Sequence, residues 1–383
     1  MTDIIQLFSG IGVIIDDEVN DPKSNIQKVM SSFENEHIPL LKYDSLPEDR
    51  EIQKFHSVSF LLLDWKWNAG SDDLLLKENV DFIKKLNEEC FAPIFIFTNE
   101  DPNSIIRLLI DNGIYYKDKN NLIFVKHKDE VDSSEKLFSS IDEWVRNTLS
   151  VYVIKEWENR KRIASKKLFR ALYEINPNWV NVFLASSEKD SVDAAYELDS
   201  LLFENLHSRM TYIDLQNIPR TAMEIVYNAE DIRQVIQGQR FVSNDHELPN
   251  MVFTGDIFKE TIGKTDTYYI NVRPQCDCIP REGTSIDDVT LYLIKGYEKE
   301  ISKCNFSKKF GSFSDTETRV TVFPIGHKAI QFELGDFSMR NFSEIKDKRI
   351  GRLLPPFITR LVQKYALYMQ RQALPRIPEQ AVV

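Results

Sequence analysis

The chain has 383 residues, of which 42% are hydrophobic and 28% are charged, the composition of a globular protein and not of a disordered or collagen-like one. Its length favours two domains over one. The formal net charge of −11 repels phosphate backbones and anionic lipid, so we expect neither nucleic acid nor a membrane as a partner.

The cysteines do not form the dense framework of a small secreted domain. The N-terminal residues show no basic segment ahead of an apolar run, and no stretch of about eighteen apolar residues could cross a membrane. We therefore expect a cytoplasmic protein. The four cysteines are Cys90, Cys276, Cys278 and Cys304.

The first 148 residues alternate short apolar runs with amphipathic segments. Strands are predicted at residues 11–17, 39–43, 58–64, 93–98 and 122–126, and helices at 23–36, 48–55, 74–90, 103–112 and 133–149. Continuous apolar runs indicate strands that are buried on both faces. Strands that alternate with helices predict an α/β domain with a five-stranded, doubly wound parallel sheet.

Apolar residues keep a helical spacing beyond residue 149, as far as the Asn176-Pro177-Asn178 break. This predicts a long connecting helix within residues 149–185. Such a helix either packs on its own chain or forms a homodimer, and the sequence leaves both interpretations open.

Residues 186–383 are predicted to form a separate α+β module. Helices are expected near 192–210, 229–239 and 353–372, and strands at 251–253, 268–272, 289–294, 319–323 and 328–334. Apolar and polar residues alternate along these strands, and turn residues separate them, which predicts a small antiparallel sheet or barrel. We find no P-loop, no HExxH, no Gly-x-Ser-x-Gly and no helix-turn-helix with basic residues. The function of this module therefore stays open.

Polar residues follow four of the five strands predicted in the first domain, and ligands of doubly wound sheets bind beyond such strand ends. Asp16, Asp17 and Asp64 bring three carboxylates to one edge, a set of hard oxygen ligands that suits Mg²⁺. A divalent ion would offset their repulsion and the charge of a transferring phosphoryl group. Asp64 could then act as the nucleophile, while Thr98 and Lys126 each bind one phosphoryl oxygen.

This arrangement resembles the receiver domain of bacterial two-component response regulators. Its pattern is an acidic pair after the first strand, Asp after the third, Ser or Thr after the fourth and Lys after the fifth. The resemblance covers about the first 150 residues and implies that a histidine kinase phosphorylates Asp64. It also implies that Asp17 and Asp64 bind Mg²⁺ directly, that Asp16 binds it through water, and that the backbone carbonyl of Lys66 is a further ligand.

The sequence departs from the receiver pattern in two places. His127 follows Lys126 where receivers usually have proline, and Ile123 stands where many receivers have an aromatic switch residue. The side chain of Lys66 either faces the phosphoryl group or extends to solvent. The C-terminal region is similar to modules found on atypical bacterial receivers, among them those of anti-phage phosphorelays of the Detocs type.

We expect a signalling protein that accepts a phosphoryl group on Asp64 and regulates or buffers a phosphorelay, and is itself not an enzyme. One alternative is a phosphate sink that drains a kinase without an output. Another is an enzyme whose active site lies in the C-terminal module and is gated by the receiver. A third is a degenerate receiver that serves only as a protein-binding module.

Overall fold

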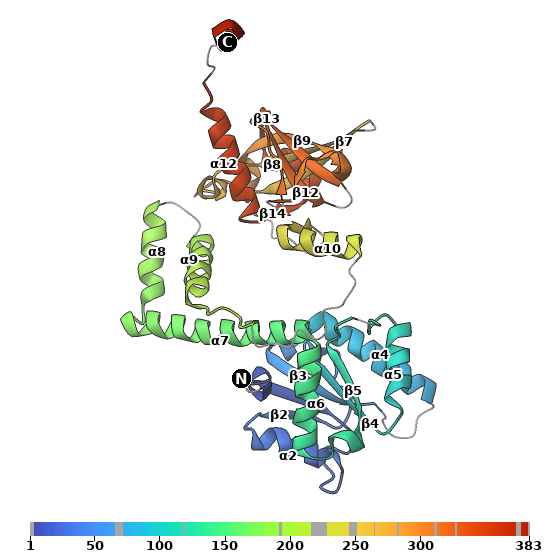
Figure 1. Cartoon of the computed structure of the whole chain (residues 1–383). Coiled ribbons are helices and arrows are strands. Elements are labelled where there is room, and N and C mark those ends of the chain that lie inside the picture. Colours follow the sequence, from blue (N-terminus) through green and yellow to red (C-terminus); the bar gives the residue numbers. More distant parts are fainter. Residues whose placement is uncertain are drawn as a thin grey trace. The chain divides into compact units, whose positions relative to one another are not determined.

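The structure is a computed structural model that describes residues 4–65, 72–117, 119–190, 194–215, 228–244, 251–263, 265–281, 283–309, 312–325, 328–372 and 377–381. The chain divides into two compact units (Figure 1). Met1–Glu174 and Glu204–Ile225 form the first, which we call the parallel-sheet unit. Ile175–Phe203 and Val226–Val383 form the second, the antiparallel-sheet unit. The predicted limits of 1–148, 149–185 and 186–383 stay predictions.

The parallel-sheet unit has five parallel strands in the order β2-β1-β3-β4-β5. The predicted doubly wound sheet is therefore confirmed. The strands are β1 (Ile11–Ile15), β2 (Leu40–Tyr43), β3 (Val58–Asp64), β4 (Ile94–Thr98) and β5 (Ile123–His127), and the helices are α1 (Ile4–Leu7), α2 (Ile26–Asn35), α3 (Asp49–Ile52), α4 (Asp72–Glu89), α5 (Pro102–Asp111), α6 (Ser134–Asn147) and α7 (Leu149–Ile175).

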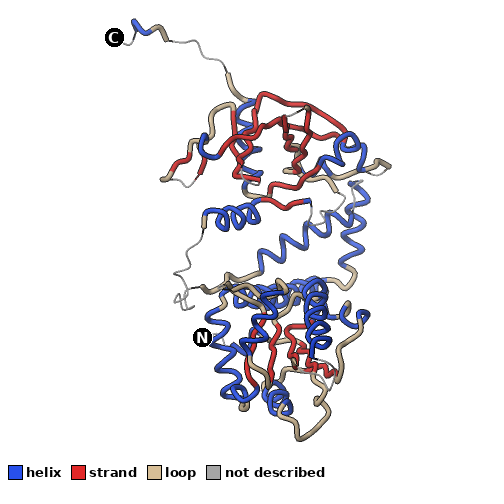
Figure 2. Tube along the Cα trace, turned by 90° about the vertical axis from the view of Figure 1, so that its right-hand side faces the viewer, coloured by secondary structure: helices blue, strands red, loops and turns tan. Residues whose placement is uncertain are grey.

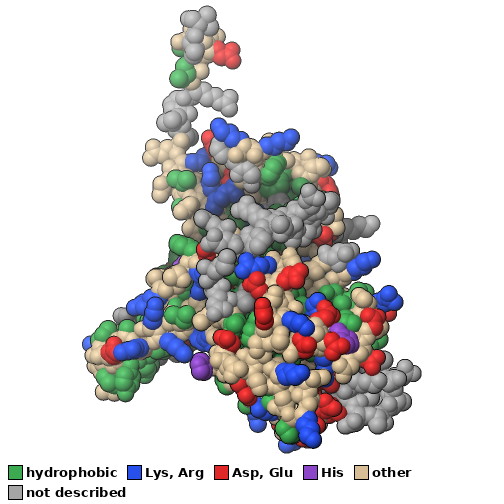
Figure 3. Space-filling view, turned by 60° about the horizontal axis from the view of Figure 1, so that its bottom comes forward, with side chains coloured by type: hydrophobic (Ala, Val, Ile, Leu, Met, Phe, Trp, Pro, Cys, Tyr) green, Lys and Arg blue, Asp and Glu red, His purple; other side chains and the backbone are tan. Residues whose placement is uncertain are grey.

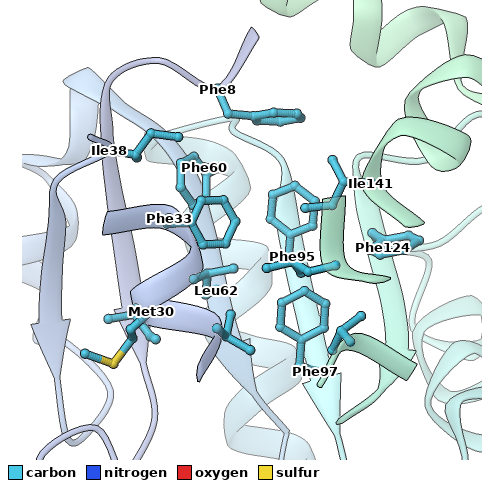
Figure 4. Close-up of a cluster of buried hydrophobic side chains, with 14 of the residues drawn as sticks. Phe8, Met30, Phe33, Ile38, Phe60, Leu62, Phe95, Phe97, Phe124 and Ile141 are labelled. Carbon is cyan, nitrogen blue, oxygen red and sulfur yellow. The ribbon is translucent and has the colours of Figure 1, made fainter. Parts of the chain in front are cut away.

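Side chains of this sheet alternate between two hydrophobic layers, because successive residues of a strand point to opposite faces. One layer packs against α1, α2 and α6 and is rich in aromatic rings. Figure 4 shows Phe33, Phe60 and Phe95 close together in it. The other layer packs against α4 and α5, through residues such as Ile83 and Leu109. Cores on both faces fix the sheet, and with it the edge at which the strands end.

The antiparallel-sheet unit contains a seven-stranded sheet in the order β12-β13-β9-β8-β7-β14-β6, with antiparallel neighbours throughout. The prediction of an antiparallel sheet is confirmed. The strands are β6 (Phe241–Ser243), β7 (Asp256–Ile262), β8 (Thr265–Asn271), β9 (Thr290–Glu300), β12 (Arg319–Ile325), β13 (Lys328–Asn341) and β14 (Arg349–Leu353), and β10 (Phe306–Ser307) pairs with β11 (Ser312–Phe313) in a separate ribbon. The sheet curls into a half-barrel (Figure 2).

Helices accompany this sheet. The last long one, α12 (Phe357–Met369), packs Ile358 and Leu361 into the hydrophobic cluster on one face of the curled sheet. The other helices of this part of the chain are α8 (Trp179–Asp190), α9 (Ala194–Arg209), α10 (Ala229–Arg240) and α11 (Phe342–Ile345). None of the helices among the described residues is both long and apolar enough to cross a membrane.

Three strands of this sheet, β6, β7 and β14, were missed by the sequence patterns. The segment predicted as strand 251–253 lies outside regular structure, while β7 begins at Asp256. The helix predicted from residue 353 begins at Phe357, because residues 349–353 pair as β14 with β7 and β6. Asp256 is fully buried and forms ion pairs with Arg352 at 2.7 Å and Arg349 at 3.6 Å. Charged residues that are buried in ion pairs interrupt the hydrophobic pattern from which a strand is predicted.

Phe60→Ala should test the aromatic layer. The Phe60 side chain is fully buried, and its ring centroid lies 5.0 Å from that of Phe33 and 5.8 Å from that of Phe95. We expect a loss of about 3–5 kcal/mol in the free energy of unfolding, because a cavity is left in the core. Phe91→Ala, at a side chain that is 55% exposed, is the control and should cost less than about 1 kcal/mol. Urea unfolding followed by circular dichroism measures both, and equal losses would contradict the packing.

Candidate functional site

The candidate site lies where β1, β3 and β4 end at the same edge of the parallel sheet. Asp64 is the last residue of β3, and Asp16 follows the last residue of β1. The register pairs Ile15 with Leu63, so the next residue on each strand is an aspartate. Asp17 completes a group whose carboxylate oxygens lie within 4.8 Å of one another. The three aspartates predicted from the sequence are therefore brought together.

Burial disfavours the charged forms of the carboxylates in this cluster. The Asp16 side chain is fully buried, and that of Asp64 is about 9% exposed. Loss of hydration and, to a smaller extent, the charge of Asp16 raise the pKa of the Asp64 carboxyl to about 6, against the lowering effect of Lys128. Burial likewise raises the pKa of Asp16, whose Oδ1 accepts a hydrogen bond from the Glu18 backbone N–H at 2.8 Å. The two carboxylates need a cation between them to remain charged together.

Lys128 supplies that cation. Its Nζ lies 3.1 Å from Oδ2 of Asp64 and 3.4 Å from Oδ2 of Asp16, and its side chain is only 9% exposed. Burial alone would lower the pKa of the Lys128 ammonium, but the two carboxylates raise it above the usual value. Lys128 therefore stays protonated and bridges the two aspartates.

The structure places Lys128, and not the predicted Lys126, in contact with the carboxylates. Nζ of Lys126 forms an ion pair with Oε2 of Glu130 at 2.9 Å, at a side chain that is 33% exposed. β5 runs through His127, so Lys126 still belongs to the strand, whereas Lys128 stands just beyond its end. Residues two apart share one face of a strand, so alternation could not choose between the lysines. Only the length of β5 decides which of them reaches the carboxylates.

The remaining predicted residues have different outcomes. Thr98 ends β4, is fully buried, and its Oγ1 accepts a hydrogen bond from the Glu100 backbone N–H at 3.0 Å. Its neighbour Phe97 pairs with Asp64 across the sheet, so Thr98 lies at the same edge as the carboxylates. Lys66, predicted to contribute its backbone carbonyl, lies outside the described residues.

The donor set fits a magnesium ion. Three carboxylates offer hard oxygen ligands on one side, which leaves coordination positions for water, as Mg²⁺ prefers. The raised pKa values of Asp16 and Asp64 show that the carboxylates repel each other and lack hydration, and a divalent cation offsets both effects. Asp16, Asp17 and Asp64 are the residues that would hold the ion.

No family model matches the sequence, and no curated protein is similar to it. Among solved structures, the receiver domain of NtrC4 from Aquifex aeolicus is 16% identical with a TM-score of 0.25, and the match covers 36% of this chain and 96% of that one. The signal receiver domain of an HD domain-containing protein from Pseudomonas fluorescens Pf-5 is 10% identical with a TM-score of 0.26, over 37% and 98%.

Likenesses at this level indicate nothing about function. The strand order β2-β1-β3-β4-β5 is the doubly wound order whose ligand site lies at the carboxyl ends of the first and third strands. Together with the aspartates at those two ends, it makes the parallel-sheet unit a receiver-like domain.

Replacing each lysine by methionine should separate their roles. Lys128→Met removes the cation shared by Asp16 and Asp64, so at about pH 8 we expect the free energy of unfolding to fall by about 3–5 kcal/mol. Lys126→Met breaks only a partly exposed pair with Glu130 and should cost less than about 1 kcal/mol. Urea titrations of both variants and of the unmodified chain provide the comparison.

The penalty of Lys128→Met should shrink at lower pH. The pKa of Asp64 is about 6 in the unmodified chain, where Lys128 lowers it, so it should be higher in Lys128→Met. The folded variant therefore takes up a proton at higher pH than the unmodified chain and recovers stability relative to it as pH falls. The loss at about pH 5 should therefore be smaller than the loss at about pH 8. If Lys126→Met proves the more damaging change, or if the loss from Lys128→Met does not depend on pH, the bridging role is wrong.

Proposed function

We propose that the protein is a two-component signalling protein whose receiver-like domain accepts a phosphoryl group from a histidine kinase on Asp64. The observation that carries this proposal is the buried group of Asp16, Asp17, Asp64 and Lys128 at the edge of a sheet with the receiver strand order. In this role the domain is a phosphoacceptor and not an enzyme that turns over its own substrate.

The chemistry follows from the positions of the side chains. A carboxylate oxygen of Asp64 attacks the phosphorus of the donor, the bond to the donor's leaving group breaks, and an acyl phosphate forms on Asp64. Lys128, which neutralises the carboxylate beforehand, would move its ammonium to a phosphoryl oxygen, and the Thr98 hydroxyl would donate to another. Bound Mg²⁺ supplies positive charge to the phosphoryl oxygens.

The residue at the aromatic switch position bears on whether the receiver-like domain has a regulatory output. Receivers that signal often have an aromatic residue three positions before the lysine. Counted from Lys128 this residue is Val125, and counted from Lys126 it is Ile123. Both are aliphatic, buried and packed in the layer with α4 and α5. This favours the phosphate sink as a second candidate function.

Several finer features belong to the same proposal. The sequence resemblance extends it to an anti-phage phosphorelay of the Detocs type and to a cytoplasmic location. A homodimer through α7 would use apolar side chains that the helix exposes, such as Trp157, Phe169 and Tyr173. Figure 3 shows hydrophobic side chains gathered at the left, where α7 ends in Figure 1.

Beryllofluoride or acetyl phosphate with Mg²⁺ should modify the full chain once, at Asp64. We expect one adduct per chain on the unmodified protein and none on Asp64→Asn, because the amide is no nucleophile. Asp44→Asn is the matched control, since this exposed aspartate follows the neighbouring strand β2. Intact mass spectrometry measures the acetyl phosphate adduct, and fluorine NMR measures beryllofluoride.

The control variant should react like the unmodified chain, and chelation of Mg²⁺ should suppress the adduct. A protein that stays unmodified, or that reacts equally after Asp64→Asn, would favour a degenerate receiver used only for protein binding.

Hydrogen exchange can distinguish a regulator from a phosphate sink. We expect beryllofluoride to slow amide exchange around Asp64 and Lys128, where new hydrogen bonds form. A regulator should also show changed exchange in peptides from 228–383, whereas a sink should not. Mass spectrometry of the full chain with and without beryllofluoride, and of Asp64→Asn treated in the same way, provides the measurement.

A further inference from the structure

A cavity of about 550 Å³ opens in the antiparallel-sheet unit. It lies between β12 at one edge of the curled sheet and β14 near the other, and α10 and α12 both contact β12 (Figure 1). Its size falls in the range of small-molecule sites, and the open mouth of a curled sheet is a common place for one. The apolar lining residues are Ile236, Phe306, Phe313, Val320, Val322, Leu353, Pro356 and Phe357, and the polar ones are Arg240, Ser312, Thr321 and Arg360.

Two arginines give this largely apolar cavity a positive end. The Arg240 guanidinium stacks on the Phe357 ring, with 4.6 Å between the guanidinium carbon and the ring centroid. Arg360 forms an ion pair with Asp315 and donates to the backbone carbonyl of Phe313 at 3.4 Å. These contacts hold both planar groups in place, which favours bidentate binding of a carboxylate or a phosphate.

The two guanidinium groups also repel each other. Burial lowers the pKa of Arg240, and the charge of Arg360 lowers it further. Asp315 accepts hydrogen bonds from Arg360 and from the Thr321 backbone N–H. An anion bound between the arginines would offset their repulsion, while its apolar part would cover the side chains of Val320, Val322 and other residues of the lining.

The lining favours binding over catalysis. Among the described residues around the cavity, none is His, Cys, Asp, Glu or Lys, so no general base or acid faces its interior. Thr321 Oγ1 accepts a hydrogen bond from the Gln331 amide at 3.1 Å and thereby has a structural partner. A hydroxyl without a nearby base is a weak nucleophile.

We propose that this cavity is a binding site for a small organic anion, with a carboxylate or phosphate group held by Arg240 and Arg360 and an aromatic or aliphatic body packed on the apolar lining. The site is independent of the aspartates in the parallel-sheet unit. It would make the antiparallel-sheet unit a ligand sensor.

Calorimetric titration of the full chain with four probes tests the site. Naphthyl phosphate and naphthoate carry both an aromatic body and an anionic group, naphthol lacks the charge, and inorganic phosphate lacks the body. We expect one molecule of naphthyl phosphate or naphthoate per chain, and roughly tenfold or more weaker binding of naphthol and of inorganic phosphate. The stronger of the two anionic probes identifies the head group that the arginines prefer.

Two arginine variants locate the binding. Arg240→Gln should weaken binding of the anionic probes by roughly tenfold or more and should leave naphthol binding unchanged. Arg319→Gln is the matched control, because Arg319 lies on β12 outside the cavity, half exposed and paired with Glu333 at 2.7 Å. It should bind all four probes like the unmodified chain.

Phe306→Ala gives a second test that does not rely on a buried residue, since this ring at the cavity is 53% exposed. It should weaken naphthyl phosphate and leave inorganic phosphate unchanged. The proposal is overturned if neither anionic probe binds at millimolar concentration or if naphthol binds as tightly as they do. It is also overturned if Arg240→Gln, shown to be folded by circular dichroism, binds like the control; should that variant not fold, an unchanged affinity in Phe306→Ala overturns it.

Discussion

Two buried carboxylates that share one ammonium group determine the chemistry of the receiver-like domain. Asp16 and Asp64 are held at the sheet edge by strands that are packed on both faces, so neither can move away to reach water. Lys128 stabilises their charged forms. A group that binds a cation before any ligand arrives is already arranged for a metal ion and for the charge of a phosphoryl group, because the same carboxylates and the same ammonium serve in each case.

The two hydrophobic layers of the parallel-sheet unit hold the strand ends at this edge in position. The aromatic layer and the aliphatic layer fix the register of β1 against β3, and that register brings the aspartate at the end of one strand beside the aspartate at the end of the other. The sheet therefore determines how the aspartates lie relative to each other. A shift of one residue would turn one aspartate away from the other and leave Lys128 with one partner.

The antiparallel-sheet unit follows a different principle. Its sheet curls without closing, and the cavity lies between strands near its two edges, lined by apolar side chains and by Arg240 and Arg360. The acidic residues that we propose as a phosphoacceptor site lie in one unit, and the arginines that we propose as an anion site lie in the other. The two sites have opposite charge, so the chemistry proposed for one does not extend to the other.

The sequence by itself determined the parallel sheet, its strand ends and the three aspartates, because apolar runs and terminal acidic residues are local features that fold class and sheet geometry make interpretable. The sequence also predicted an antiparallel second part, but it missed β6, β7 and β14. In β7 and β14, Asp256 and its arginine partners interrupt the apolar pattern. Only the tertiary structure showed that Lys128 contacts the carboxylates and Lys126 does not, and that Arg240 and Arg360 line the same cavity. The lysine contacts depend on where β5 ends, and the cavity depends on how elements far apart in the chain pack together. The local spacing of residues in the sequence predicts neither.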